Sequence, residues 1–341
     1  MKFAVGYQLP EEDEEPFVDI VRDYREHILE VYFPWTDLPS GRASLASRRG
    51  YVDWTAQQRL EADLRAFREM GLQLDLLFNA NCYGGKAASK FLQNQVLSVL
   101  EHLSNVAGGV DIVTTTSLAV ARTVKHYLPD IDVRASVNMR IGTVQGMEYV
   151  KGLFDSYYLQ RDRQRNIAYV ERIRRWADQE QKLLCMLANS GCLRYCPGQT
   201  FHDNLVAHEQ DVDEMDNIEN WTPHVCWNLY RDRANWPAIL QATWVRPEDL
   251  HHYEKFFDVI KLATRMHANP RLVIHAYADQ KYRGNLLDLF EPGFGPAFAP
   301  SIIDNTKFPD NWFEKTSTCK NECELCTYCK DVLEQTLVRF E

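Results

Sequence analysis

Two groups of cysteines in the second half of this 341-residue chain have the residue type and spacing of a metal site. The first group contains Cys192, Cys196 and, thirty residues further on, Cys226. The second places four thiols within eleven residues, at Cys319, Cys323, Cys326 and Cys329. Random composition does not cluster thiols in this way, and such clusters indicate either a disulfide framework or bound metal.

The cellular compartment decides between disulfides and metal, because thiols stay reduced in the cytoplasm. The N-terminal residues turn acidic after Pro10 and lack the apolar core and the cleavage site of a secretory signal. No apolar run approaches the roughly 20 residues that span a membrane. We therefore expect a cytoplasmic protein without a membrane segment, whose clustered cysteines bind metal.

The first group fits an iron–sulfur cluster, since thiolates are the ligands that soft and borderline metals prefer. A proline directly follows Cys196, as is common in iron–sulfur loops. Three cysteines leave the fourth ligand open. Cys82 is expected at the end of a neighbouring strand, whereas Cys185 is expected inside a strand as a small buried hydrophobe. The alternative is that these thiols are buried separately and share no ligand.

The second group also favours an iron–sulfur cluster, with four irons as the expected form. Zinc ribbons separate their two cysteine pairs by a dozen or more residues, and no such spacer stands between Cys323 and Cys326. Zinc is the alternative. The first three thiols also match the triplet of radical S-adenosylmethionine enzymes, but Cys329 would fill the coordination site that must stay open in those enzymes.

The sequence motifs of common hydrolases are absent. His208 and Glu209 begin a zinc-protease-like motif, but Val212 stands where that motif requires a histidine. There is no Gly-x-Ser-x-Gly elbow and no Gly-rich phosphate loop. A net charge of −10 argues against a broad nucleic-acid surface, although it leaves room for a local basic site.

Predicted strands and helices alternate along the chain and must position these groups. Seven or more strand–helix pairs with short connections predict a parallel sheet, and short strands that are apolar on both faces favour an α/β protein with a (β/α)8 TIM-like barrel. We assign residues 1–290 to the barrel, 192–238 to an irregular Cys-containing insertion, and 291–341 to a Cys-rich C-terminal metal-binding extension. The strands are predicted at residues 2–8, 30–35, 72–79, 110–116, 132–139, 155–160, 182–188, 239–243 and 257–263.

Barrel enzymes carry their active sites at the C-terminal ends of the strands and in the loops that follow. Polar and cationic side chains that could act in catalysis are predicted at those positions: Asn138, Arg161, Arg163, His202, Lys261 and Arg265. The cations would hold the carboxylate of a small anionic substrate. A cationic barrel mouth in an otherwise acidic protein would also draw an anion inward.

Short motifs in a fixed order carry a resemblance to a known family. They are Ser40-Gly41-Arg42, Asn81-Cys82-Tyr83, Ser136-Val137-Asn138, the run from Arg161 to Asn166, Asn189-Ser190-Gly191-Cys192 with Cys196, the run from Trp244 to Leu250, and the run from Ile260 to Arg265. Over residues 1–270 the chain resembles the collagenase-like peptidases, peptidase family U32.

The resemblance implies a barrel, and several members of that family bind an iron–sulfur cluster through four cysteines. Cys192, Cys196 and Cys226 fall where members place cluster ligands. Some members act in oxygen-independent hydroxylation, in ubiquinone synthesis or on RNA bases, with prephenate implicated as the oxygen donor. A few are described as collagenases.

Three hypotheses follow. The first is an iron–sulfur hydroxylase or related redox enzyme that acts on a small anionic or aromatic substrate or on an RNA base, with the C-terminal group passing electrons to the first cluster. The second is a peptidase-family hydrolase. The third is a non-catalytic, zinc-stabilised subunit that works with a homologous partner.

Overall fold

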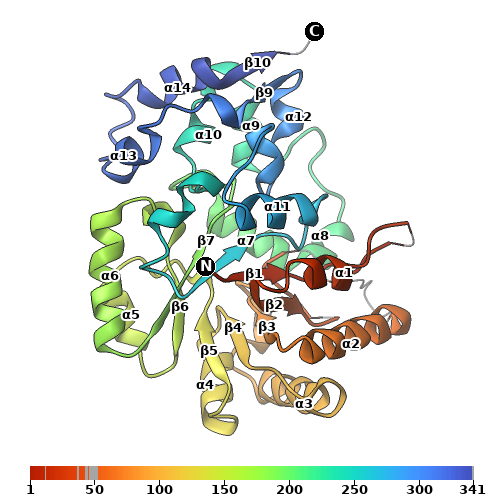
Figure 1. Ribbon diagram of the computed structural model, residues 1–341. Coiled ribbons are helices and arrows are strands. Elements are labelled where there is room, and N and C mark those ends of the chain that lie inside the picture. The colour runs from red at the N-terminus through yellow and green to blue at the C-terminus, as the bar shows by residue number, and fades with distance from the viewer. Residues whose placement is uncertain (12, 37, 43–44, 46–52, 340–341) are drawn as a thin grey trace.

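The computed structural model describes residues 1–11, 13–36, 38–42, 45 and 53–339. Its centre is a closed barrel of eight parallel strands, in which β1 pairs with both β2 and β8. The predicted (β/α)8 barrel is therefore confirmed (Figure 1). The strands are β1 Phe3–Gly6, β2 Ile28–Pro34, β3 Gln73–Phe78, β4 Ile112–Thr115, β5 Asp132–Ala135, β6 Ser156–Tyr158, β7 Leu183–Leu187 and β8 Val259–Leu262.

Helices connect the strands around the outside of the barrel, and local signals set several of their ends. The side chains of Ser89, Ser117 and Asn166 accept backbone N–H groups of the first helical turn, which would otherwise lack partners. None of the described helices is long and apolar enough to cross a membrane. The helices are α1 Phe17–Asp23, α2 Trp54–Glu69, α3 Lys90–Ala107, α4 Leu118–Tyr127, α5 Val144–Val150, α6 Ile167–Gln179 and α11 Pro270–Ala278.

The region between β7 and β8 consists of short helices joined by loops. They are α7 Gln199–Ala207, α8 Glu209–Asp213, α9 Val225–Tyr230, α10 Ala238–Gln241 and the 3-10 helices η4 Arg233–Asn235 and η5 Pro247–His252. The predicted strand at residues 239–243 is wrong, because α10 occupies this segment. A short apolar run suits a buried strand and a buried helix equally well, and here Ile239 and Leu240 enter the core from a helix.

The C-terminal segment forms a small unit of its own elements. The strands β9 Ser301–Ile303 and β10 Leu337–Arg339 pair antiparallel, and α13 Trp312–Ser317 and α14 Tyr328–Thr336 lie between them in the chain. Figure 1 shows these blue elements together at one end of the molecule, near α9 and α10. Trp312 stacks on Trp244 with ring centroids 5.8 Å apart, so aromatic side chains join this segment to the rest of the protein. The predicted domain boundary at residue 290 stays a prediction.

Candidate functional site

The first cysteine group lies in the loop after β7 and on α9. Cys192 and Cys196 precede α7, and Cys226 is the second residue of α9. Burial, and then the charges on Cys192 and Cys196, raise the pKa of Cys226 to about 11. The charges of the other two thiols therefore act on Cys226, and the role of the three cysteines as cluster ligands stays a prediction.

Arginine side chains surround Cys192. Burial acts to raise the pKa of its thiol, but the guanidinium groups of Arg161 and Arg42, together with a hydrogen bond to Ser190, lower it. Arg161 is itself held in place, because its Nη1 donates to Ser190 Oγ at 2.9 Å. The thiolate is the form of cysteine that binds metal, so Cys192 is the most readily available ligand of the group.

A cavity of about 870 Å³ lies next to this group. A cavity of this size accommodates a small-molecule ligand. It has both apolar and polar walls, which include Arg42, His202, His224, Cys226, Trp227, Phe290 and Glu291.

A salt bridge between Arg42 and Glu291 forms part of the cavity wall, with Nε and Oε1 3.0 Å apart. Glu291 is fixed there by its backbone, since its N–H donates to the carbonyl of Asn189 at 3.1 Å and its carbonyl accepts the N–H of Gly191 at 3.1 Å. Neither residue of the pair is among the predicted site residues. The Ser40-Gly41-Arg42 motif is a signal for Arg42, whereas no local pattern places Glu291 at the barrel.

His202 is the predicted catalytic residue whose side chain lines this cavity. Its ring centroid lies 4.7 Å from that of His224. Burial, followed by the charges of Arg42 and His224, lowers the pKa of His202 to about 4. The imidazole is therefore neutral at neutral pH and can accept a proton or a hydrogen bond.

Lys261 lies inside the barrel, among buried charges of both signs. Its Nζ is 3.5 Å from the centroid of the Tyr32 ring. Arg134 donates to both carboxylate oxygens of Glu30, at 2.6 and 2.9 Å, and lies 3.8 Å from Asp75. Burial lowers the pKa of Lys261 and raises that of Asp75.

Asn138 and Arg265 are buried at the barrel mouth, as the sequence predicts. Arg265 Nη1 donates to Ser40 Oγ at 2.9 Å. Asn138 lies so near Gly41 that a Cβ at this glycine would be 2.8 Å from Asn138 Nδ2. Arg265 therefore holds the loop that carries Arg42, and Asn138 lies against it.

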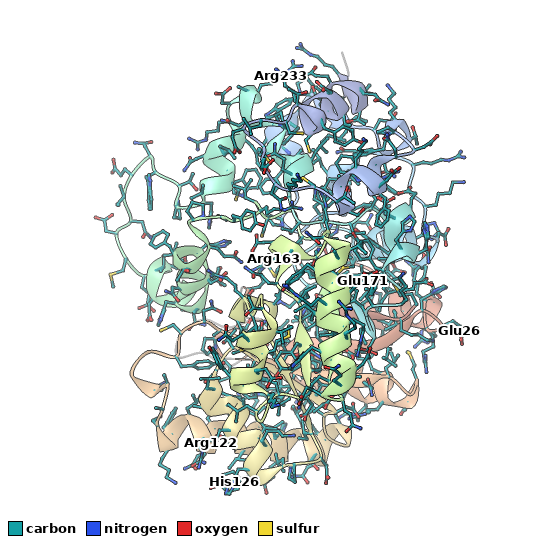
Figure 2. The ribbon with its side chains drawn as sticks, turned by 90° about the vertical axis from the view of Figure 1, so that its left-hand side faces the viewer. Glu26, Arg122, His126, Arg163, Glu171 and Arg233 are labelled. Atoms are coloured by element: carbon teal, nitrogen blue, oxygen red, sulfur yellow. The ribbon has the colours of Figure 1, made fainter. Side chains whose placement is uncertain are left out.

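Arg163 is placed differently from the other predicted cations. It is exposed on the outer surface ahead of α6, where Figure 2 labels it, and its guanidinium lies 5.4 Å from the centroid of the Tyr169 ring. The structure thus separates Arg163 from Arg161, although only two positions divide them in the chain.

The two candidates for the fourth ligand have different surroundings. Cys185 is fully buried inside the barrel, where burial raises the pKa of its thiol to about 12. The prediction that it packs as a small hydrophobe is confirmed. Cys82 lines the same cavity as His208 and accepts the N–H of Gly84 at 3.3 Å. Its role as a ligand stays a prediction.

Comparisons with known proteins bear on the family. No family model matches the chain. A curated relative, the uncharacterized protease MJ1657 of Methanocaldococcus jannaschii, is 23% identical over 333 residues, which cover 93% of this chain and 91% of the relative. A solved structure, that of the U32 peptidase Mk0906, matches with a TM-score of 0.52 and 18% identity over 76% of this chain and 92% of that chain. The predicted resemblance to the U32 peptidases is confirmed.

The C-terminal cysteines add a second thiol group to this U32-peptidase-like barrel. Cys319 follows α13, Cys329 lies on α14, and Cys323 and Cys326 are exposed. Burial raises the pKa of Cys329 to about 11, with the other three sulfurs adding to the effect and the charge of Arg165 opposing it. Among the residues that the structure describes, no group of three or more His, Cys, Asp or Glu side chains is arranged to hold a single metal ion.

Arg194 joins the two cysteine groups of the U32-peptidase-like chain. It lies between Cys192 and Cys196 in the sequence, and its guanidinium donates to the side-chain oxygen of Asn321. Asn321 lies in turn between Cys319 and Cys323. The loops that carry the two groups are therefore in direct contact, which their separation in the sequence does not indicate.

Proposed function

We propose that this U32-peptidase-like barrel is a cytoplasmic iron–sulfur enzyme whose active site is the cavity beside Cys226. The observation that carries the proposal is the grouping of this thiol with Cys192 and Cys196, under the guanidinium groups of Arg42 and Arg161. Neighbouring thiolates repel one another, and a cationic cluster bound by all three removes that repulsion. When bound, the cluster would supply one-electron chemistry.

The walls of the cavity favour a small substrate with a carboxylate and an apolar or aromatic part. Arg42 offers a guanidinium, the group best suited to bind a carboxylate. Trp227 and Phe290 supply aromatic surface for the rest of the molecule. His202, neutral at neutral pH, is placed to accept a proton at a ring nitrogen. A hydroxylase or related redox reaction fits this combination of groups.

For the C-terminal group we propose a second iron–sulfur cluster, with zinc as the alternative. The contact between Arg194 and Asn321 supports this, because electrons pass between clusters only over short distances. The exposure of Cys323 and Cys326 would leave the second cluster open to an external electron donor.

Anaerobic purification followed by iron, sulfide and zinc analysis tests both assignments. We expect a brown protein, and we expect Cys192→Ala and Cys326→Ala each to lose part of the iron, while the interior variant Cys185→Ala keeps all of it. Full iron content in both ligand variants would contradict the two-cluster assignment. A colourless protein with stoichiometric zinc would instead favour a zinc-stabilised subunit.

Peptide hydrolysis is the second candidate, and the names of both similar proteins favour it. A peptidase needs an activated nucleophile or a metal-bound water. Cys82 beside His208 supports this candidate, because the pair has the composition of a thiol nucleophile and its base. Cleavage of labelled gelatin by the full chain, and its loss on Cys82→Ala, would make hydrolysis the principal activity.

A further inference from the structure

A small cavity, of about 240 Å³, lies where the C-terminal segment meets the barrel. Arg163 and Arg165 reach it from the segment between β6 and α6, and Arg194 reaches it from the loop after β7. Thr316 on α13 and Asn321 in the following loop form the opposite wall. The volume is below the range of about 300–1,000 Å³ that drug-sized ligands occupy, so the cavity suits a small ion or one group of a larger molecule.

Three arginines line this cavity against a single carboxylate, that of Asp162. The carboxylate already accepts the N–H of Tyr195 at 2.6 Å and the side-chain amide of Gln160 at 3.0 Å. Within the described part of the chain, none of the three arginines forms an ion pair. The cavity therefore has an excess of positive charge that no side chain of the protein compensates.

Arg165 is almost completely buried, with 4% of its surface exposed. Its Nε and Nη1 donate to the backbone carbonyls of Trp244 and Leu240, at 2.7 and 2.9 Å. Its Nη2 is also buried, and no described residue accepts a hydrogen bond from it. A guanidinium stays charged in proteins, and leaving one of its N–H groups buried without an acceptor is costly. We therefore expect an acceptor at this nitrogen that is not part of the chain.

Arg194 has a similar vacancy on the same cavity. One of its terminal N–H groups donates to the side-chain oxygen of Asn321, whereas its Nε is buried without an acceptor among the described residues. Burial and then the charge of Arg194 lower the pKa of Arg165 to about 10. The two guanidinium groups thus repel each other, and an anion between them would turn this repulsion into attraction.

We propose that this cavity is a phosphoryl-binding site, which takes inorganic phosphate or the phosphoryl group of a small phosphate monoester. A phosphate dianion matches the excess positive charge better than a single carboxylate does, and its oxygens fit the donor geometry of arginine. The helix α6 begins at Ile167, directly after the cavity residue Asn166. The positive end of its dipole favours the same ligand.

A bound phosphate would also connect the barrel to the C-terminal segment, because the arginines belong to barrel loops and Asn321 belongs to that segment. The site goes beyond the proposed iron–sulfur function. Cys319 lies in the cavity wall, but none of the proposed phosphate donors is a thiol.

Isothermal titration calorimetry of the full chain with inorganic phosphate, and separately with phenyl phosphate, tests the proposal. We expect saturable one-to-one binding; binding of phosphate alone would identify the free ion as the ligand, and binding of phenyl phosphate alone a monoester. Arg194→Gln should weaken binding about 10-fold or more, the effect of losing a hydrogen bond from a charged group. Arg122→Gln is the matched control, since Figure 2 labels this exposed arginine far from the C-terminal segment.

Arg165→Lys keeps the charge but loses the guanidinium fork, and it should weaken binding as well. Arg194→Gln decides the question if Arg165→Lys does not fold. No saturable binding of either probe would overturn the proposal, and so would equal affinities of Arg194→Gln and the unmodified protein.

Iron content separates this site from a cluster. We expect Arg194→Gln to keep the iron of the unmodified protein. Loss of iron together with phosphate binding in this variant would overturn the proposal, because the guanidinium would then compensate the charge of the cluster. Phosphate binding by a protein that contains no iron would contradict the iron–sulfur proposal and support this one.

Discussion

Inside the barrel, single buried residues of opposite charge stabilise one another. Glu30 and Arg134 are each 1% exposed and form a two-point ion pair, and Asp75 accepts hydrogen bonds from the backbone N–H and the hydroxyl of Thr114. The positive charges of Arg134 and Lys261 match the negative charges of the two carboxylates. Removing one of the four leaves a charge without compensation in a medium that solvates it poorly.

Glu30→Gln should therefore lower the free energy of unfolding by about 3–5 kcal/mol, the range for a broken buried ion pair. Urea unfolding followed by circular dichroism measures the change. Glu26→Gln is the control, because Glu26 is exposed and labelled at the surface in Figure 2. This control should change stability by less than about 0.5 kcal/mol. Equal effects of the two substitutions would show that the interior pair does not contribute to stability.

Asp249 should make stability depend on pH. Burial raises the pKa of this carboxyl to about 6, against the opposing charge of Arg246. The folded state then holds the proton more tightly than the unfolded state, whose carboxyl titrates near its ordinary pKa of about 3.9. This contribution to stability is complete below that value and is lost as the pH rises through about 6.

Asp249→Asn should remove that loss. Relative to the unmodified protein, the variant should gain roughly 2 to 3 kcal/mol between pH 4 and pH 7, from about 1.4 kcal/mol per pKa unit. Urea unfolding at the two pH values measures the difference. Asp130→Asn, at an exposed position, is the control and should show the same pH dependence as the unmodified protein. A gain as large in this control would contradict the assignment to Asp249.

At the scale of elements, an aromatic stack joins α13 to the loop before η5. Trp312 on α13 lies between Trp244 and Tyr328, with ring centroids 5.8 and 6.0 Å away. Arg165 covers the Trp244 ring at 4.3 Å and donates to the Trp244 carbonyl at 2.7 Å. Because Tyr328 directly precedes Cys329, this stack also positions the second cysteine group.

Trp312→Ala should lower the free energy of unfolding by about 3–5 kcal/mol, as expected for truncating a buried aromatic side chain. Trp54→Ala is the matched control, since Trp54 is 65% exposed. Thermal unfolding of both variants measures the difference, and a similar midpoint for the two would show that the stack does not hold the C-terminal elements.

At the scale of the whole molecule, cations gather at one end of the barrel although the net charge is −10. Arg42, Arg161 and the neighbouring Lys261 and Arg265 come from three different parts of the chain and are brought together at the barrel mouth and just inside it. The clustered cations draw anions into the cavities, whereas the acidic remaining surface repels them. The proposed site beside Cys226 would use this field, because its substrate carries a carboxylate.

The sequence alone is sufficient to predict the barrel and to identify the two cysteine groups. Strand and helix patterns are local, so the alternation that predicts a parallel barrel can be read from short windows. Close spacing likewise keeps Cys192 near Cys196, and Cys319 near Cys323, in any compact fold. The one wrong strand, at residues 239–243, lies where periodicity cannot distinguish a short buried helix from a strand.

Only the tertiary structure decides which distant residues meet. Glu291 reaches Arg42 because its backbone pairs with the loop after β7, and His208 lines one cavity with Cys82 because the insertion packs beside the loop after β3. Arg194 meets Asn321 in the same way. Such contacts depend on how the barrel closes and how the insertion and the C-terminal segment pack on it, and local sequence patterns carry no information about that packing.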